Sequence, residues 1–270
     1  MSEQPKELWS TGAPYDRYVG RWSRKVATEF LGWLSVSAGK AWVDVGCGTG
    51  SLVENILGRC DPASVVGIDR SEGFLVEARR KITDTRVRFQ VGDAMDLPLD
   101  AATCDVAVSG LVLNFVADHA AMVREMARVT KPGGKVAVYV WDYAGGMEMM
   151  RHFWDAALAV SPDDARLDEA GRFPICHPDA LSALWQEVGL TAITVQAIDI
   201  PTVFRDFEDY WTPFLGKQGP GPTYLASVDS ETQGRIREHL QTRLVPAADG
   251  TIALSARVWA VQGSVASPGS

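Results

Sequence analysis

Short apolar or alternating runs bounded by polar turns recur along the first half of the chain, and they indicate buried β-strands. These runs lie at 42–45, 64–69, 87–91, 104–109 and 135–141. Between them, apolar residues at helical spacing indicate helices, expected at 51–57, 72–81 and 119–128. Lys131-Pro132-Gly133-Gly134 is typical of a helix stop followed by a turn. Strands that alternate with helices predict a parallel sheet covered on both faces.

The second half of the chain is less regular. Helical spacing returns in two stretches, 147–158 and 178–188, with a polar loop expected through Ala170. Two β-rich segments, 190–200 and 251–262, predict a sixth and a seventh strand, with an insert at 201–250 between them. The insert carries aromatic residues among its charges, namely Phe204, Phe207, Tyr210, Trp211, Phe214 and Tyr224. Inserts of this length often form lids.

The length of the chain bounds the number of domains. A chain of 270 residues is near the upper size for one hydrophobic core, and its hydrophobic content of 46% is enough to fill that core. We therefore expect one domain, residues 1–262, rather than two independent ones. Residues 263–270 are rich in Ser, Gly and Pro, and we expect them to form a disordered tail.

Charge and cysteine content narrow the classes of function. The formal net charge of −8 argues against binding to nucleic acid or anionic lipid and favours a small-molecule partner. The cysteines form no CxxC pair and show no metal-ligand spacing, so we expect reduced thiols and no metal site. Since no apolar run reaches membrane-spanning length and residues 1–10 do not resemble a signal peptide, we expect a cytoplasmic protein.

The segment 42–50, with the sequence WVDVGCGTG, joins an apolar strand to a helix through glycines. Gly46 and Gly48 permit positive φ and let main-chain amides approach a ligand closely, and Gly50 opens a helix whose first N–H groups are unpaired. This geometry predicts a nucleoside ligand. The dinucleotide pattern would place its third glycine at position 51, which is Ser51 here.

Three carboxylates at expected strand ends suggest which nucleoside binds. Asp44 would repel a pyrophosphate but attract the cationic amino-acid part of S-adenosylmethionine. Asp69 follows the second strand at about the 20-residue spacing typical of a ribose contact, although it can instead cap the helix near Ser71. Asp93 and the N–H of Ala94 can bind an adenine edge, although Gly-Asp is also a common turn dipeptide.

Four ordered segments, 43–50, 67–69, 92–98 and 129–134, resemble class I S-adenosylmethionine-dependent methyltransferases of the small-molecule, ubiquinone/menaquinone-biosynthesis type. The resemblance covers about two fifths of the chain. It implies a doubly wound, Rossmann-like α/β fold. In that fold the seven-stranded sheet is mostly parallel, its last strand is antiparallel, and helical lid inserts are added.

The resemblance also implies a separate role for each segment of the chain. Residues 1–35 would cover the cofactor, 41–141 would bind it, and 142–175 and 201–250 would form inserts on the substrate side. S-adenosyl-L-methionine would be the cofactor and S-adenosyl-L-homocysteine the product. The residues expected to bind it are Asp44, Gly46, Cys47, Gly48, Gly50, Asp69, Arg70, Asp93, Ala94, Ser109 and Leu111. In the N-terminal cover, Tyr18 would pack over the methionine part and Arg21 would pair with its carboxylate, although such an arginine is often a solvated surface residue.

Candidates for the methyl-acceptor side follow the fifth strand, because ligands of open α/β sheets bind at the carboxyl ends of the strands. We expect Trp141, Tyr143, Phe153 and Trp211 to contact an apolar or aromatic acceptor, although helical core packing would give the same spacing. Methyl transfer from a sulfonium needs alignment more than acid–base help, so a general base is optional. The candidates for that base are His152, Tyr143 and His119.

Two other classes of function remain open from the sequence. An NAD-dependent oxidoreductase is disfavoured by Asp44 and Ser51, for the reasons given above. A protein that binds S-adenosylmethionine without turnover would share the same motifs. Methylation of nucleic acid or protein is disfavoured because the residues after the fourth strand, 109–115, lack the Pro-Pro-aromatic signature of amide and exocyclic-amine methylation.

Overall fold

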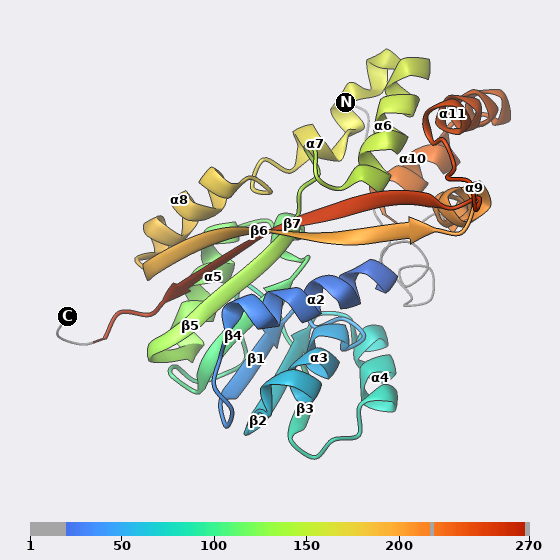
Figure 1. The fold of residues 1–270 in the computed structure, drawn as a ribbon. Coiled ribbons are helices and arrows are strands. Elements are labelled where there is room, and N and C mark those ends of the chain that lie inside the picture. The colour runs from blue at the N-terminus through green and yellow to red at the C-terminus, as the bar shows by residue number, and fades with distance from the viewer. Residues whose placement is uncertain (1–19, 217–218, 268–270) are drawn as a thin grey trace. The chain divides into compact units, whose positions relative to one another are not determined.

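A seven-stranded sheet with the strand order β3-β2-β1-β4-β5-β7-β6 organises the computed structural model, which describes residues 20–216 and 219–267 (Figure 1). The strands are β1 (Ala41–Val45), β2 (Ser64–Asp69), β3 (Val87–Val91), β4 (Cys104–Gly110), β5 (Thr130–Trp141), β6 (Thr191–Phe204) and β7 (Ile252–Ser264). Six strands are parallel and β7 is antiparallel, so the predicted fold class is confirmed.

Helices and short 3₁₀ turns connect the strands. The helices are α2 (Arg21–Leu34), α3 (Ser51–Cys60), α4 (Glu72–Lys81), α5 (His119–Val129), α6 (Glu148–Val160), α7 (Glu169–Arg172), α8 (Pro178–Val188), α9 (Phe207–Trp211), α10 (Pro220–Ser227) and α11 (Ser230–Arg243). The 3₁₀ turns are η2 (Leu113–Phe115), η3 (Pro162–Leu167) and η4 (Thr212–Gly216). The insert expected at 201–250 is therefore mostly helical, as the fold prediction required.

Strand β1 lies at the centre of the parallel part of the sheet. It pairs with β2 through Val43↔Val66 and with β4 through Val43↔Ala107. Its side chains from Trp42 to Val45 are all buried, as expected for a strand covered on both faces. The strand order reverses between β1 and β4, and the loops that leave such a pair diverge to form a crevice at the carboxyl ends.

The chain divides into two compact units. Within the described residues, the core unit comprises 23–140, 175–198 and 258–267. The insert unit comprises 20–22, 141–174, 199–216 and 219–257, and apart from its N-terminal residues it nearly coincides with the inserts expected at 142–175 and 201–250. Whether the two units act as the single domain expected from the length stays a prediction.

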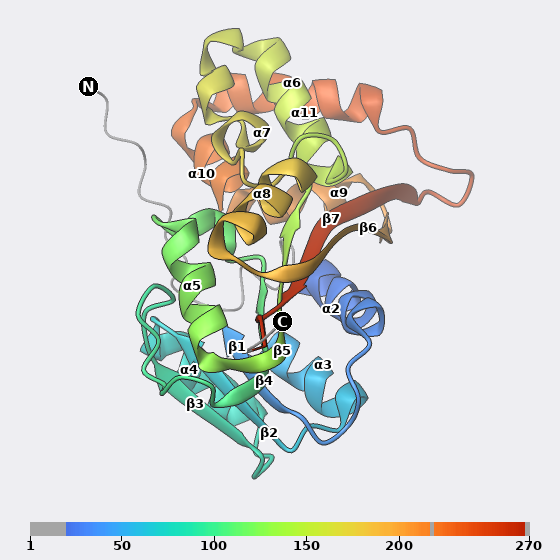
Figure 2. The same cartoon turned by 90° about the vertical axis from the view of Figure 1, so that its left-hand side faces the viewer.

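Helices cover both faces of the sheet within the core unit. Figure 2 shows α3 on one side of β1, β4 and β5 and α5 on the other side, and α8 packs against α5. Helix α5 forms because Asp118 caps it, with its Oδ1 accepting a hydrogen bond from the N–H of Ala121 at 2.9 Å. Its apolar face, which includes Met122 and Met126, is fully buried.

Helix α5 ends at Val129, close to the expected position, but the chain does not turn as expected at Lys131-Pro132-Gly133-Gly134. Strand β5 begins at once, at Thr130. Its pairing with β4 passes from Cys104↔Thr130 directly to Val106↔Lys135, so the residues between form an irregularity in the strand. Gly133 has a φ of 76°, which lets the backbone bulge there.

The insert unit folds around buried aromatic side chains. Helix α6 packs against α10 and α11, and Figure 1 shows these helices gathered together. The Phe153 ring stacks on that of Phe214 with their centroids 4.4 Å apart, and the Tyr210 hydroxyl donates to the carbonyl of Met149 at 2.8 Å. Aromatic pairs of this kind add about 0.5–1.5 kcal/mol to the free energy of burial. The aromatic residues of the insert therefore form a core of their own.

Several element boundaries differ from the expected ones. The polar loop expected through Ala170 was wrong, because η3 and α7 occupy this region and the Asp168 side chain caps α7 by accepting from the N–H of Ala170 at 3.0 Å. Strand β6 continues to Phe204, and β7 continues to Ser264, two residues into the segment expected to be a tail. None of the helices in the described ranges combines the length and apolarity that a membrane crossing needs.

Replacing Phe153 with alanine should lower the free energy of unfolding by about 3–5 kcal/mol, because it leaves a cavity beside Phe214. Urea-induced unfolding measures the change. The exposed Val245 gives the control, since Val245→Ala should change the free energy by less than about 0.5 kcal/mol. A loss below about 1 kcal/mol for Phe153→Ala would show that this ring is not part of a packed core.

Candidate functional site

The loop between β1 and α3 uses its glycines in three different ways. Gly46, with φ 75°, could not carry a side chain, because a Cβ there would lie 2.6 Å from Cγ2 of Val112. Gly50, with φ 88°, likewise lies too close to Ile82 for a Cβ. Gly48, with φ 53°, has open space on the side where a Cβ would point, so its backbone is accessible to a ligand.

Asp44 lies directly before this loop, near the end of the central strand, and its side chain is only 1% exposed. Its Oδ2 atom is buried and has no hydrogen-bond partner within the described part of the chain. Burial, followed by the charge of Asp69, raises the pKa of Asp44 to about 8. The site therefore contains a buried acid for which the described residues supply no compensating charge, and a cationic ligand would provide it.

Asp69 ends β2 and holds the glycine loop in place. Its Oδ2 accepts a hydrogen bond from the N–H of Gly48 at 2.9 Å, and its Oδ1 accepts one from the N–H of Ser71 at 2.8 Å. The cap of α4 is Ser71 itself, whose hydroxyl accepts from the N–H of Phe74 at 3.4 Å. Each Asp69 oxygen retains a further lone pair, so the carboxylate can still receive ribose hydroxyls.

Asp93 and Ala94 follow β3 in a tight turn. The Asp93 side chain is exposed, and its Oδ1 accepts a hydrogen bond from the N–H of Met95 at 2.8 Å. The N–H of Ala94 has no hydrogen-bond partner within residues 20–216 and 219–267. The turn expected as the alternative is therefore present, and the same turn leaves a donor and an acceptor side by side. Arg70, beside Asp69, is exposed.

The end of β4 and the residue that follows it carry two of the expected residues, Ser109 and Leu111. The Ser109 hydroxyl is buried and donates to the carbonyl of Val45 at 2.6 Å, so it links β4 to β1. Leu111 has a φ of 63°, a left-handed conformation that is rare for leucine and costs of order 1–3 kcal/mol. Its N–H donates to the carbonyl of Tyr139 at 2.8 Å. Any part of Ser109 in ligand binding must therefore come from its backbone.

The thiol of Cys47 lies within the glycine loop and is buried. Burial, followed by the charges of Asp44 and Asp69, raises its pKa well above the ordinary value. A neutral thiol is a poor nucleophile, so Cys47 contributes shape and backbone rather than reactivity.

The N-terminal cover is only partly described, because Tyr18 lies outside the described residues. Arg21 belongs to the insert unit, where its Nη1 lies 3.1 Å from Oδ2 of Asp209. Its guanidinium carbon also lies 4.4 Å from the ring centroid of Trp22 and 4.8 Å from that of Phe204. Arg21 is thus neither a solvated surface residue nor unpaired, and its expected contact with a methionine carboxylate stays a prediction.

The residues expected to contact the acceptor all belong to the insert unit, and all are buried. They are Trp141, Tyr143, Phe153 and Trp211. Phe153 and Trp211 pack against other aromatic rings, so helical core packing accounts for their spacing. Their contact with an acceptor stays a prediction.

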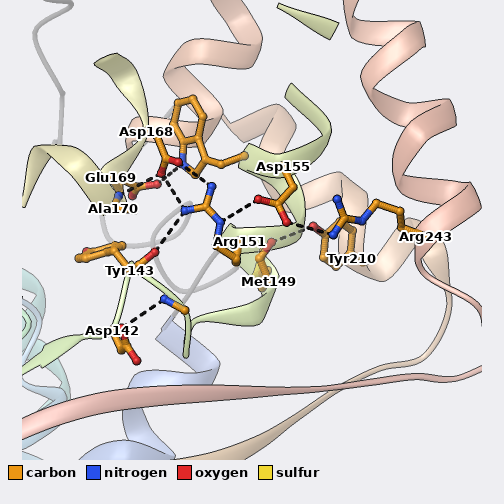
Figure 3. A network of polar contacts seen from close by, with 12 residues as sticks. Asp142, Tyr143, Met149, Arg151, Asp155, Asp168, Glu169, Ala170, Tyr210 and Arg243 are labelled. Atoms are coloured by element: carbon orange, nitrogen blue, oxygen red, sulfur yellow. Dashed lines mark hydrogen bonds and ion pairs between the residues drawn. The ribbon is translucent and has the colours of Figure 1, made fainter. Parts of the chain in front are cut away.

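A polar network that the sequence did not reveal joins the segments of the insert unit around Arg151 (Figure 3). Its Nη1 and Nη2 donate to the two carboxylate oxygens of Asp168 at 3.0 and 2.6 Å, and its Nε donates to Asp155 at 3.0 Å. Arg243 of α11 donates to the other oxygen of Asp155 at 3.0 Å. Of these contacts, the sequence signals only the i,i+4 pair of Arg151 and Asp155.

The expected base candidates lie in different units. His152 is half-buried in α6, and its Nδ1 is buried with no hydrogen-bond partner among the described residues. Burial, followed by the charge of Arg243, lowers the pKa of His152. Burial also lowers the pKa of His119, the first residue of α5 in the core unit. Both imidazoles are therefore neutral near pH 7, as a general base must be. The contacts of the two histidines do not identify either of them as a catalytic base.

Comparison with known proteins agrees with this geometry. Residues 43–138 match a family described as a methyltransferase domain. The demethylmenaquinone methyltransferase of Halalkalibacterium halodurans is 32% identical to this chain over 177 residues, covering 60% of this chain and 72% of that protein. This chain belongs to the class I S-adenosylmethionine-dependent methyltransferases.

Two further similarities extend over more of the chain. The O-methyltransferase cnsE of Penicillium expansum is 31% identical over 204 residues, covering 73% of this chain and 70% of that protein. The crystal structure of the YcgJ protein of Bacillus subtilis shares the fold, with a TM-score of 0.59 and 16% identity, over 92% of this chain and all of that one.

S-adenosylmethionine is the cofactor of this methyltransferase. The residues at the ends of β1, β2 and β3 fit it chemically, because they offer a buried acid without a counter-charge, an accessible glycine backbone and further carboxylates. The described residues contain no group of three or more His, Cys, Asp or Glu side chains arranged to hold a metal ion.

The raised pKa of Asp44 should make the free energy of unfolding of the cofactor-free protein depend on pH. Because its folded pKa is about 8, the folded chain holds a proton that the unfolded chain releases near pH 4. The resulting stabilisation is complete below pH 4 and is lost as the pH rises through 8. Relative to Asp44→Asn, the wild type should lose up to about 1.4 kcal/mol per pH unit in this window.

Urea-induced unfolding at pH 5, 7 and 9 measures this difference. The control is Val245→Ala, since Val245 is exposed and carries no titratable group, so its replacement should leave the pH profile parallel to that of the wild type. Parallel profiles for the wild type and Asp44→Asn would show that Asp44 titrates like an ordinary carboxylate.

Proposed function

We propose that Asp44 faces the positively charged amino-acid part of S-adenosylmethionine, and that the methyl group goes to a small apolar or aromatic molecule. In this proposal Asp69 accepts the ribose hydroxyls, and Asp93 with the N–H of Ala94 binds the adenine. The glycine loop passes along the methionine part. The observation that carries the proposal is the buried Oδ2 of Asp44, which has no hydrogen-bond partner among the described residues.

Electrostatics favours this ligand over a nicotinamide dinucleotide. A carboxylate removed from water interacts with a nearby charge far more strongly than it would in solution. A pyrophosphate at the glycine loop would meet the charge of Asp69, and it would hold the Asp44 carboxyl in its neutral form rather than balance it. An ammonium or sulfonium group would instead supply the missing charge, so the oxidoreductase alternative is disfavoured.

The bound cofactor supplies a methyl group already activated by a positively charged sulfur. The protein therefore has to hold and align the reactants rather than generate a reactive group. Asp69 holds the conformation of the glycine loop by accepting a hydrogen bond from the N–H of Gly48. The close packing of Gly46 on Val112 fixes the path of the loop. The burial of Asp44 keeps water from competing for its charge.

The acceptor class rests on two supports. The relative from Halalkalibacterium halodurans is named for demethylmenaquinone, and the insert unit of this chain is rich in aromatic side chains. The net charge of −8 supports a small molecule rather than a nucleic acid as the acceptor. A cytoplasmic location remains part of the same proposal.

Calorimetry with S-adenosylhomocysteine tests the cofactor assignment. At pH 7, binding should release a proton, because the ligand's ammonium group stabilises the charged form of Asp44. Affinity should rise by up to about tenfold per pH unit between pH 6 and 8, and Asp44→Asn should show neither effect. If NAD bound instead and S-adenosylhomocysteine gave no heat, the assignment would be wrong.

A methyl-transfer screen tests the acceptor class. Labelled S-adenosylmethionine should transfer its methyl group to reduced quinones, phenols or other apolar acceptors, and transfer to highly polar acceptors such as trans-aconitate should be at least about tenfold slower. Activity confined to polar acceptors would contradict the proposal while leaving the cofactor assignment intact.

A further inference from the structure

Asn114, in η2, is buried without using its polar groups. Its side chain is 6% exposed, and both Nδ2 and Oδ1 are buried with no hydrogen-bond partner among the described residues. Buried carboxamides almost always pair, because an unpaired amide has lost its water without gaining a replacement. Such a group needs a partner from outside the described residues, either a bound water or a ligand.

Asn114 belongs to the core unit and follows closely on a residue that contacts the glycine loop. Asp44 pairs with Val108 in the sheet register, so the carboxyl ends of β1 and β4 lie next to each other. The chain that leaves β4 runs past Gly46, where the methyl groups of Val112 leave no room for a Cβ. Asn114 follows Val112 by two residues, and the segment between β4 and η2 includes the strained Leu111.

A satisfied asparagine in the same unit shows what a structural role looks like. In Asn55 of α3, Nδ2 donates to the carbonyl of Ser51 at 2.9 Å, and Oδ1 accepts from the hydroxyl of Thr28, also at 2.9 Å. Both ends of that amide support the fold. Asn114 has the same chemical groups, but they form no hydrogen bond within the described chain.

The two free ends of Asn114 define the chemistry of the missing partner. A carboxamide offers an acceptor and two donors, so a single partner that satisfies both ends must accept and donate a hydrogen bond. A carboxylate cannot donate, and an ammonium cannot accept. A hydroxyl group does both. In the function proposed above, the charged and ribose groups of the cofactor already have Asp44 and Asp69 as partners, so this hydroxyl belongs to the methyl acceptor.

We propose that Asn114 binds a hydroxyl group of the methyl acceptor, and that the acceptor is therefore a phenol, an enol or a hydroquinone. This inference rests on the proposed function. Asn114 is a residue that determines substrate specificity in it, because a site built to pair a hydroxyl discriminates against analogues that lack one.

The test compares two ligands that differ only in their hydroxyl groups, naphthohydroquinone and naphthalene. Their binding to the complex of the enzyme with S-adenosylhomocysteine is measured for the wild type, Asn114→Leu and Asn114→Ala. Both substitutions should weaken naphthohydroquinone binding by about tenfold or more, and neither should weaken naphthalene binding. Affinity for S-adenosylhomocysteine should stay within about twofold.

Thermal unfolding without ligands separates this role from a structural one. Asn114→Leu removes an unpaired polar group and should raise the Tm, whereas the control Asn55→Leu removes two hydrogen bonds and should lower it. If Asn114→Leu does not fold, Asn114→Ala removes the amide without adding bulk. The binding of naphthohydroquinone and naphthalene to that variant then tests the inference.

The outcomes that overturn the inference are distinct from failure of the proposed function. If the wild-type complex binds no naphthohydroquinone, or binds it equally well after either substitution, Asn114 does not recognise the acceptor. If both substitutions lower the Tm and weaken S-adenosylhomocysteine binding, Asn114 supports the cofactor site. The absence of S-adenosylhomocysteine binding to the wild type would instead remove the cofactor assignment on which the proposed function rests.

Discussion

The candidate site of this methyltransferase depends on a carboxylate that is buried at the end of the central strand. No positive charge from the described chain balances it. Asp44 is 1% exposed, and its Oδ2 has no hydrogen-bond partner within the described residues. Leaving a charge in such a place is costly, and the protein keeps it neutral by raising its pKa to about 8. In the proposed function, the cationic amino-acid part of the cofactor stabilises the charged form of Asp44 and so offsets this cost.

The fold places this acid near the carboxyl end of β1, at the edge of the sheet where ligands of open α/β folds bind. The strand order reverses between β1 and β4, and the chain leaves the two strands in different directions. Gly46 allows the segment after β4 to pack against the loop, and the space beside Gly48 is open. Asp69, at the end of the neighbouring strand, holds this loop by accepting a hydrogen bond from the N–H of Gly48. The binding loop is thus held by contacts with β2 and with the segment after β4, rather than by the loop's own sequence alone.

The parts of the structure that depend on local sequence could be predicted. Alternation of apolar and polar residues gave the strands and most helices, and the glycine spacing with Asp44 and Asp69 indicated the cofactor. Contacts between distant residues could not be predicted. Arg21 meets Asp209, 188 residues away, and Arg151 meets Asp168 through a network that no periodicity encodes. The contact of Gly46 with Val112 is of the same kind.

The same distinction explains why the acceptor side was harder to predict than the cofactor side. Cofactor contacts come from short motifs at strand ends, whose geometry is largely fixed by the backbone. Aromatic residues such as Phe153 have the same helical spacing whether they pack in a core or line a pocket, and here they are buried among other rings. For a buried asparagine, a missing partner is a more specific signal than an apolar surface, because polar groups are seldom buried without one.

The most direct test of this account is a carbon-detected NMR titration of the Asp44 carboxyl group, assigned by its loss in Asp44→Asn. The account requires a pKa near 8 in the cofactor-free enzyme and a lower value once S-adenosylhomocysteine is bound. A carboxyl group that titrates near pH 4 without ligand, or whose pKa S-adenosylhomocysteine leaves unchanged, would contradict it.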